Sequence, residues 1–214
     1  MSMLYLVRHG ETDYHLRKQA LGRIDAELNP LGERQSVLVA EALGAKGIKA
    51  IYSSPLTRCR QTAGPLAEKL GLAVEPLDGL QEIDLGEWDG LPFSEIYEKG
   101  GEAFHRWMAA PAEVRIPGGE ILGEVSRRVL EAARTILLRH SVEEDVAIFT
   151  HGGPLRLLLC HAMGLDINRI FRVEVDLASI SAIKCFGKSL EEDAAAALIN
   201  DTCHLGASRS GTRG

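Results

Sequence analysis

The chain lacks the features that mark several common protein classes. It has only four cysteines, Cys59, Cys160, Cys185 and Cys203, and none of them forms a Cys-x-x-Cys pair. Such usage favours buried thiols in a reducing cytoplasm over disulfides or zinc ligands. No apolar stretch approaches the roughly 20 residues that span a membrane, and the N-terminus has no signal-peptide pattern. We therefore expect a cytoplasmic protein with no membrane partner.

Positive charge and the usual cofactor motifs are also scarce. The formal net charge is -6 at pH 7 and there is no basic run, so the composition does not indicate a nucleic-acid partner. A P-loop, a Gly-x-Ser-x-Gly motif and a metal-ligand cluster are all missing from the sequence. We predict no metal and no cofactor. A local group of cations in this acidic chain would suit a small anion.

Apolar runs and helical patterns alternate at the start of the chain. Short apolar runs at Leu4–Val7, Ala50–Tyr52 and Leu72–Leu77 are typical of strands. Between them, Asn29-Pro30 and Ser54-Pro55 each place a capping residue and a proline where a helix begins. This alternation predicts βαβ units and a parallel sheet, which defines the α/β class.

An irregular segment at about 78–119 interrupts the alternation. It holds both tryptophans and helical patterns at Phe93–Lys99 and Ala103–Met108. An insertion between regular units is where a lid or a substrate-selecting cap would lie. The helical pattern returns at Val125–Leu137, and Val146–Thr150 has the composition of a buried strand.

The last part of the chain contains shorter patterns. A helix is expected from His151 to about Met163, and short strands at Phe171–Val175, Ser179–Phe186 and Ala194–Ile199. The length of the chain favours one domain, which we place at 1–205. We expect the small, polar tail at 206–214 to be disordered.

Polar residues follow the predicted strands at comparable places. Arg8 and His9 come after the first strand, and Arg58 lies in the first turn of the helix after the second. His151 and Gly152 follow the strand that ends at Thr150. The carboxyl ends of parallel strands share one sheet edge, so these groups can converge. Arginines, imidazoles and a helix N-terminus suit a tetrahedral phosphoryl group.

A phosphoryl site without a metal needs a nucleophile and a proton donor. A neutral imidazole attacks phosphorus directly, and neighbouring cations would keep His9 neutral. The acid should be a carboxylate at the mouth of the site. Glu82 is the natural candidate because it follows the third strand, and the spacing leaves Glu11, Asp84 and Glu87 open. A cysteine nucleophile at Cys59 is the weaker alternative.

Collinear motifs carry a resemblance to a known family. They include Arg8-His9-Gly10-Glu11-Thr12, Leu28 to Gln35, Ser53 to Ala63, the Glu82 segment, Pro117-Gly118-Gly119-Glu120 and Thr150-His151-Gly152-Gly153. With these motifs the sequence resembles the histidine phosphatase superfamily, also called phosphoglycerate mutase-like. The resemblance implies a three-layer αβα sandwich, with a mostly parallel central sheet and helices on both faces.

The resemblance also implies roles for individual residues. His9 would be the nucleophile that forms a phosphohistidine, and Glu82 would be the general acid. Arg8, Arg58 and His151 would hold the phosphoryl oxygens, with the Gly152 N–H nearby. We also place His15 and Gly22 in the substrate site. At the position of His15 the family commonly has Asn, and we expect the charge of an imidazole there to make the site sensitive to pH.

These features predict hydrolysis of a small phosphate ester with water as the final acceptor. The pattern is most similar to α-ribazole-5′-phosphate phosphatases and broad-specificity relatives. A phosphoglycerate mutase is the alternative, disfavoured because acids at Asp84, Glu87 and Asp89 would repel a second phosphate. A non-catalytic phosphate-binding module is a third possibility. Trp88, Phe93, Tyr97 and Trp107 would either stack on a leaving group or fill a cap core. Monomer and homodimer both remain open.

Overall fold

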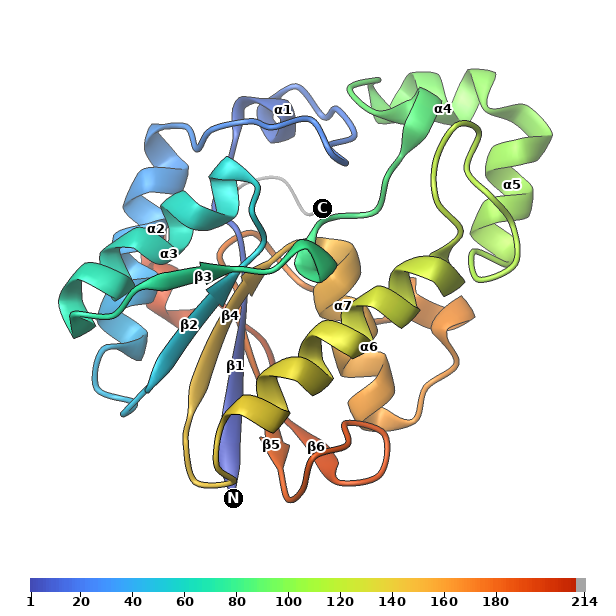
Figure 1. Cartoon of the computed structure of the whole chain (residues 1–214). Coiled ribbons are helices and arrows are strands. Elements are labelled where there is room, and N and C mark those ends of the chain that lie inside the picture. Colours follow the sequence, from blue (N-terminus) through green and yellow to red (C-terminus); the bar gives the residue numbers. More distant parts are fainter. Residues whose placement is uncertain (211–214) are drawn as a thin grey trace.

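A six-stranded sheet lies at the centre of the computed structural model, which describes residues 1–210 (Figure 1). The strand order is β3-β2-β4-β1-β5-β6. The first four strands in that order are parallel, and β5 and β6 form an antiparallel edge. Their bounds are Val74–Pro76 (β3), Ala50–Ser53 (β2), Val146–Thr150 (β4), Ser2–Arg8 (β1), Ile180–Cys185 (β5) and Ala194–Asp201 (β6).

Helices cover both faces of this sheet. Helices α2 (Pro30–Leu43) and α3 (Thr57–Leu70) pack on one face, and α6 (Leu122–Arg139) and α7 (Gly152–Met163) pack on the other. The alternation of side chains along a strand explains why both faces are apolar. In β4, Phe149 joins the core with α2 and α3, whereas Ile148 joins the core with α6 and α7. The predicted three-layer α/β fold is confirmed.

The segment after β3 forms a small cap at the carboxyl edge of the parallel strands (Figure 1). It contains 3-10 turns η1 (Asp78–Leu80) and η2 (Gly86–Trp88) and helices α4 (Phe93–Lys99) and α5 (Gly101–Ala109). The short helix α1 (Asp13–Leu16) lies at the same edge. The cap therefore lies next to the carboxyl ends of the parallel strands, where the polar residues that follow these strands are located.

Helix α3 begins later than its sequence suggested. It starts at Thr57, and Ser54-Pro55 lies outside it. The reason is a contact from another loop, because Asp25 Oδ1 accepts a hydrogen bond from Thr57 N at 2.7 Å and Oδ2 accepts one from Thr57 Oγ1 at 2.8 Å. A distant carboxylate thus satisfies the N-terminus that a local cap was expected to satisfy.

The strand expected at Phe171–Val175 is wrong. The chain instead forms the 3-10 helix η3 (Ile167–Arg172), followed by an irregular segment. The carbonyls of that segment bind arginines rather than a neighbouring strand: Arg8 donates to Val175 O and Arg156 to Val173 O, each at 2.8 Å. The local apolar pattern could not show that these carbonyls already had partners.

The C-terminal segment begins with a short helix. Residues Cys203–Ser208 form the 3-10 helix η4, and Leu205 is buried in the core beside α2. Gln35 Nε2 donates to Ser208 O at 2.9 Å. Of the tail predicted at 206–214, Ser208 and Ser210 contact Gln35 of α2, and residues 211–214 lie outside the described residues.

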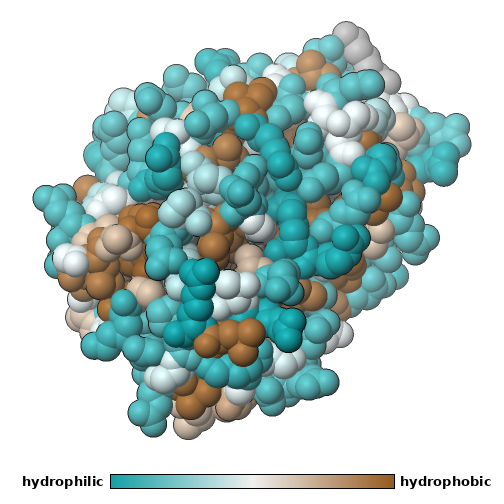
Figure 2. Space-filling model, viewed as in Figure 1, coloured by the Kyte–Doolittle hydropathy of each residue, from teal (hydrophilic) through white to brown (hydrophobic). Residues whose placement is uncertain are grey.

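The surface viewed in Figure 2 is mostly hydrophilic, and hydrophobic residues lie between the polar ones in small groups. Within residues 1–210, every helix is too short or too polar to cross a bilayer.

Candidate active site

Strand register brings the predicted site residues together. Arg8 at the end of β1 pairs with Thr150 at the end of β4, and His9 N donates to Thr150 O at 3.0 Å. His9 and His151 therefore leave adjacent parallel strands side by side. Their ring centroids lie 5.2 Å apart. The parallel sheet thus converts a separation of 142 positions in sequence into direct contact.

His9 is a buried imidazole with a defined tautomer. Its Nδ1 lies 2.8 Å from Gly10 O, and a carbonyl only accepts, so Nδ1 carries the proton and Nε2 keeps its lone pair. Burial lowers the pKa of His9 well below 6.5, and the nearby Arg58 lowers it further. Cations were expected to keep His9 neutral. They contribute, but desolvation is the larger cause.

Two buried arginines surround the imidazole. Arg8 donates from Nη1 to Val175 O, whereas its buried Nε has no partner among the described residues. Burial lowers the pKa of Arg8 to about 10, so it stays cationic at neutral pH. Arg58 is fully buried and donates to Gly22 O at 2.7 Å and to Ile24 O at 2.8 Å. These carbonyls fix the second cation in place.

His151 is tied to the same group. Its Nδ1 accepts from Arg58 Nε at 3.2 Å, so its proton lies on Nε2, which donates to Ser54 Oγ at 2.7 Å. Cys59 packs against this ring with Sγ 3.4 Å from Nε2. Burial raises the pKa of the Cys59 thiol to about 12. A neutral, buried thiol is a poor nucleophile, which removes the support for Cys59 in that role.

His15 lies on the other side of His9. The two ring centroids are 5.4 Å apart. Thr12 N donates to His15 Nδ1 at 3.3 Å, so the proton of the neutral ring lies on Nε2. Burial, with Arg8 and Arg58 nearby, lowers the pKa of His15 to about 3. The expectation that the charge of His15 varies near neutral pH is therefore wrong, because the folded protein keeps this ring uncharged.

Glu82 faces the N-terminus of α7. Its Oε1 accepts from Ile83 N at 2.9 Å and from Gly153 N at 3.2 Å. The alternative Glu11 is buried and occupied elsewhere, because its carboxylate accepts from Asn29 Nδ2 at 3.0 Å and from Ser210 Oγ. Glu82 lines the same cavity as His9, whereas Glu11 does not.

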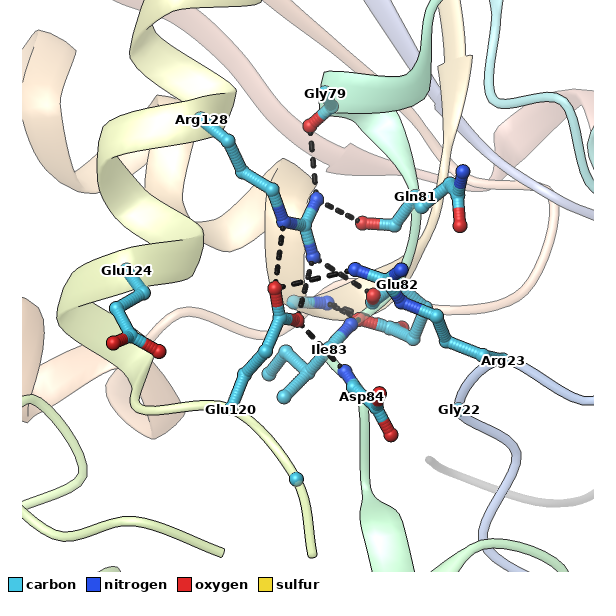
Figure 3. Close-up of polar contacts among 12 residues, drawn as sticks. Gly22, Arg23, Gly79, Gln81, Glu82, Ile83, Asp84, Glu120, Glu124 and Arg128 are labelled. Atoms are coloured by element: carbon cyan, nitrogen blue, oxygen red, sulfur yellow. Dashed lines mark hydrogen bonds and ion pairs between the residues drawn. The ribbon is translucent and has the colours of Figure 1, made fainter.

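An arginine from α6 holds the loop that carries Glu82 (Figure 3). The guanidinium of Arg128 donates to the carbonyls of Gly79, Gln81 and Glu82 at 2.9, 2.6 and 2.8 Å. It also donates to both carboxylate oxygens of Glu120, at 3.1 and 3.0 Å.

Glu120 closes this network on the other side of the loop. Its Oε2 accepts from Asp84 N at 2.9 Å, and its Oε1 accepts from Arg23 Nη2 at 3.2 Å. Hydrogen bonds to backbone groups on both sides of Glu82 restrict the position of its carboxylate. Neither Arg128 nor Glu120 was predicted as part of the site, because their contacts are to the backbone of a distant loop.

Gly152 and Gly22 have different surroundings. Gly152 opens α7, and its N–H has no acceptor within residues 1–210. A Cβ on Gly152 would lie 3.5 Å from Arg8 Cζ, so this backbone approaches the arginine closely. Gly22, in contrast, donates to Asp89 Oδ1 at 2.7 Å and accepts from Arg58. Both backbone polar groups of Gly22 are therefore used within the protein, and its contact with substrate stays a prediction.

A cavity of about 300 Å³ opens beside these residues. Arg8, His9, His15, Glu82 and Gly152 line it. Sequence reasoning missed Arg156, which also lines it and would lie 3.0 Å, through Nη1, from a Cβ on Gly152. Its position four residues after Gly152, one helical turn along α7, was the signal that could have indicated it.

The acids cited against a mutase do not face the cavity. The described residues that line the cavity do not include Asp84, Glu87 or Asp89. The Asp89 carboxylate instead accepts from the backbone N–H groups of Gly22, Arg23 and Ile24. Repulsion of a second phosphate by these carboxylates is therefore not supported by their positions.

Residues 4–196 match the histidine phosphatase superfamily (branch 1), and the chain belongs to this family. The histidines at adjacent strand ends and the buried arginines lie together at one edge of the sheet. The protein is thus an enzyme with phosphatase activity.

Similar proteins include several with named activities. Phosphoserine phosphatase 1 of Hydrogenobacter thermophilus is 36% identical over 207 residues, covering 96% of this chain and 95% of the relative. A probable phosphoglycerate mutase, GpmB of Yersinia enterocolitica, is 31% identical over 183 residues, covering 86% and 85% of the two chains. The solved structure of Bacillus stearothermophilus YhfR has a TM-score of 0.86 at 27% identity, covering 96% of this chain and 100% of that one.

Proposed function

We propose that the protein hydrolyses small phosphate monoesters through a phosphohistidine on His9, without a metal. The observation that carries this is the tautomer of His9: Nδ1–H donates to Gly10 O, and a buried neutral Nε2 is left as the nucleophile. In the first step the His9 Nε2–P bond forms and the P–O bond to the alcohol breaks. Glu82 donates a proton to the departing oxygen, which leaves as the alcohol.

In the second step water attacks the phosphohistidine. Glu82, now a carboxylate, takes a proton from the water, the N–P bond breaks, and the electron pair returns to His9. Inorganic phosphate leaves and Glu82 is protonated again, so the cycle balances.

Charge stabilisation comes from fixed donors. The unpartnered Nε of Arg8 and the N–H of Gly152 are available to equatorial oxygens, and Arg58 is held nearby as a cation. His151 Nε2–H, which bonds Ser54, is the donor on that ring that a phosphoryl oxygen would take over. Such preorganised donors stabilise a transition state without reorganising.

The test is release of phosphate from p-nitrophenyl phosphate by wild type and His9→Ala. We expect His9→Ala to lose activity, since no other group replaces the nucleophile. His105→Ala is the matched control: this histidine is exposed in the cap and does not line the cavity, so its loss should leave the rate unchanged. Appreciable turnover by His9→Ala in a folded protein would contradict the proposal.

The role of Glu82 is tested by the leaving group. Glu82→Gln removes the proton donor, so hydrolysis of alkyl phosphates should slow far more than hydrolysis of p-nitrophenyl phosphate, whose leaving group needs no proton. Equal slowing of both would place the acid elsewhere.

The finer substrate assignment is α-ribazole 5′-phosphate, supported by the similarity of the motifs to α-ribazole-5′-phosphate phosphatases. Phosphoglycerate mutase remains the second candidate, favoured by the GpmB relative and by Arg156, a cation beside the phosphoryl site. The two are separated by adding 3-phosphoglycerate with a bisphosphoglycerate primer. Isomerisation without release of phosphate would support the mutase.

A further inference from the structure

The cavity beyond the phosphoryl end is walled by apolar side chains. Trp88 and Trp107 from the cap line it, together with Phe104 and with Phe171 from η3. The rings form a continuous row of edge contacts: the centroids of Trp88 and Phe104 are 5.9 Å apart, those of Trp88 and Trp107 5.7 Å, and those of Trp107 and Phe171 5.4 Å. Edge-to-face packing of this kind fixes the rings relative to one another.

Two residues of this wall, Trp88 and Trp107, belong to the hydrophobic core and also line the cavity. Trp88 and Trp107 are 6% and 7% exposed and belong to the hydrophobic core, so the wall is rigid. Phe171 and Phe93, in contrast, are 42% and 57% exposed and also line the cavity. A ligand with an apolar body would cover apolar surface that now meets water, which is favourable. Tyr97, the fourth predicted aromatic residue, is absent from the described lining.

Charged groups are confined to the other end. Among the described residues that line the cavity, the charged ones are Arg8, Glu82 and Arg156. Arg8 and Arg156 both approach Gly152, and Glu82 accepts from Gly153, so all of them gather at the N-terminus of α7. The charges that recognise the phosphoryl group are thus separate from the aromatic wall.

Gln19, another polar lining residue, already has partners within the protein. Gln19 Oε1 accepts from Arg17 Nε at 2.8 Å, and Gln19 Nε2 donates to Gly90 O at 2.9 Å. A carboxylate or an ammonium group that extends from the phosphoryl end toward the wall would therefore meet apolar rings, while Arg8, Arg156 and Glu82 stay at the N-terminus of α7. Burying a charge without a partner is costly.

We infer that the alcohol part of the substrate is apolar or aromatic, so that an apolar phosphate ester binds more tightly than a phosphorylated amino acid of similar size. This inference rests on the proposed function, and it names the substrate class of that same site. It also separates this chain from its relatives named as phosphoserine phosphatases. Phosphoserine carries an ammonium and a carboxylate group on its leaving group, and the aromatic wall has no partner for either.

Binding can be measured without turnover, because the two tryptophans of the chain, Trp88 and Trp107, both line the cavity. We would titrate His9→Ala by intrinsic fluorescence with phosphoserine, isobutyl phosphate and benzyl phosphate. Isobutyl phosphate has methyl groups where phosphoserine has its ammonium and carboxylate groups. We expect isobutyl phosphate to bind about tenfold more tightly than phosphoserine, and benzyl phosphate more tightly still.

The wall itself is tested by Phe171→Ala in the same background. Loss of a ring at the mouth should weaken benzyl phosphate about fivefold and leave isobutyl phosphate nearly unchanged. Phe186→Ala is the matched control, since Phe186 is similarly exposed, at 53%, and does not line the cavity.

Phosphoserine binding as tightly as isobutyl phosphate would overturn the inference, as would unchanged benzyl phosphate affinity in Phe171→Ala. Failure of the proposed function is seen separately, as hydrolysis of p-nitrophenyl phosphate that does not depend on His9. The fluorescence titration gives its result in either case.

Discussion

In this site the charge state of each residue depends on its burial as much as on its chemical type. His9, His15 and His151 are all held neutral, and for each of them desolvation is the larger cause of the lowered pKa. A neutral ring can attack, accept or donate in a fixed direction. The arginines remain charged because their pKa values start far above neutral pH. The site therefore combines permanent cations with imidazoles that do not compete with them for charge.

Neutral His15 has a consequence for stability. Its pKa falls from 6.5 to about 3 on folding, so below 6.5 the unfolded chain binds a proton that the folded chain does not. Stability must then fall as the pH drops through 6.5. In His15→Asn the side chain that binds this proton in the unfolded chain is absent. Between about pH 7.5 and about pH 5.5 we expect the variant to lose about 1.4 kcal/mol less stability than wild type.

Urea unfolding at the two pH values measures that difference. His105→Ala, which removes an exposed histidine, is the control and should follow wild type. An identical loss of stability in His15→Asn and wild type would mean that His15 is accessible to protons in the folded state.

At the scale of elements, two backbones meet closely beneath the site. A Cβ on Gly32, in the first turn of α2, would lie only 2.2 Å from the backbone oxygen of Glu11. The loop after β1, which follows His9, therefore rests directly on α2. Gly64 in the middle of α3 has nothing within 4 Å of a Cβ. The same residue type is thus required in one helix and dispensable in the other.

We expect opposite effects from the matched pair. Gly32→Ala should destabilise the protein by about 1–3 kcal/mol through overpacking and should lower activity by displacing the loop. Gly64→Ala should stabilise it by up to about 1 kcal/mol, because alanine favours the helix. Thermal unfolding and phosphatase assays measure both. Equal stability of the two variants would show that the loop and α2 can separate at no cost.

The Arg128–Glu120 network links helix α6 to the loop of Glu82. Arg128→Ala removes its donors to Gly79, Gln81 and Glu82, so we expect kcat to fall by about ten- to a hundredfold with a smaller change in KM, as for a misplaced group. The loss should be greater for alkyl phosphates than for p-nitrophenyl phosphate, as in Glu82→Gln, because Glu82, the proposed proton donor, is the group that is displaced.

Arg134→Ala is the control on the same helix, since Arg134 is 67% exposed and only loosely paired with Glu131 at 3.9 Å. It should match wild type in rate and leaving-group dependence. A loss in Arg128→Ala that is equal for all leaving groups would indicate general destabilisation rather than a positioning role.

At the scale of the whole molecule, the chain carries net negative charge but concentrates arginines at one sheet edge. The formal net charge is -6, while Arg8, Arg58 and Arg156 lie around the N-terminus of α7. Long-range repulsion of a phosphate by the surface is thus offset locally by buried cations. Salt screens the attraction between these buried arginines and a phosphate less than it screens the attraction within an ion pair at the surface.

In the proposed mechanism these arginines would take the charge-neutralising role that a divalent ion has in other phosphatases. We expect hydrolysis of p-nitrophenyl phosphate to be unchanged after treatment with a chelator. The rate before and after EDTA, and after restoring Mg²⁺, measures this. Loss of activity with EDTA and recovery with Mg²⁺ would require a metal in the mechanism.

The sequence by itself determined the layers and predicted which residues of the candidate site lie together. Apolar runs that end in Arg, His or Gly predicted β1, β2 and β4 and the convergence of Arg8, His9, Arg58 and His151, because alternating burial and strand direction are local properties. The similarity of motifs added the family. Glu82 was favoured among several acids by its place after the third strand.

Only the tertiary structure decided the rest. It placed the start of α3 at Thr57 through Asp25, replaced an expected strand at 171–175 with a segment bound by arginines, and brought Ser208 into contact with Gln35 of α2. It also revealed Arg156, the Arg128–Glu120 network and the neutral His15. Each of these features depends on contact partners far away in the chain, or on burial by several elements at once. A local pattern of residues predicts neither the distant partners nor the burial.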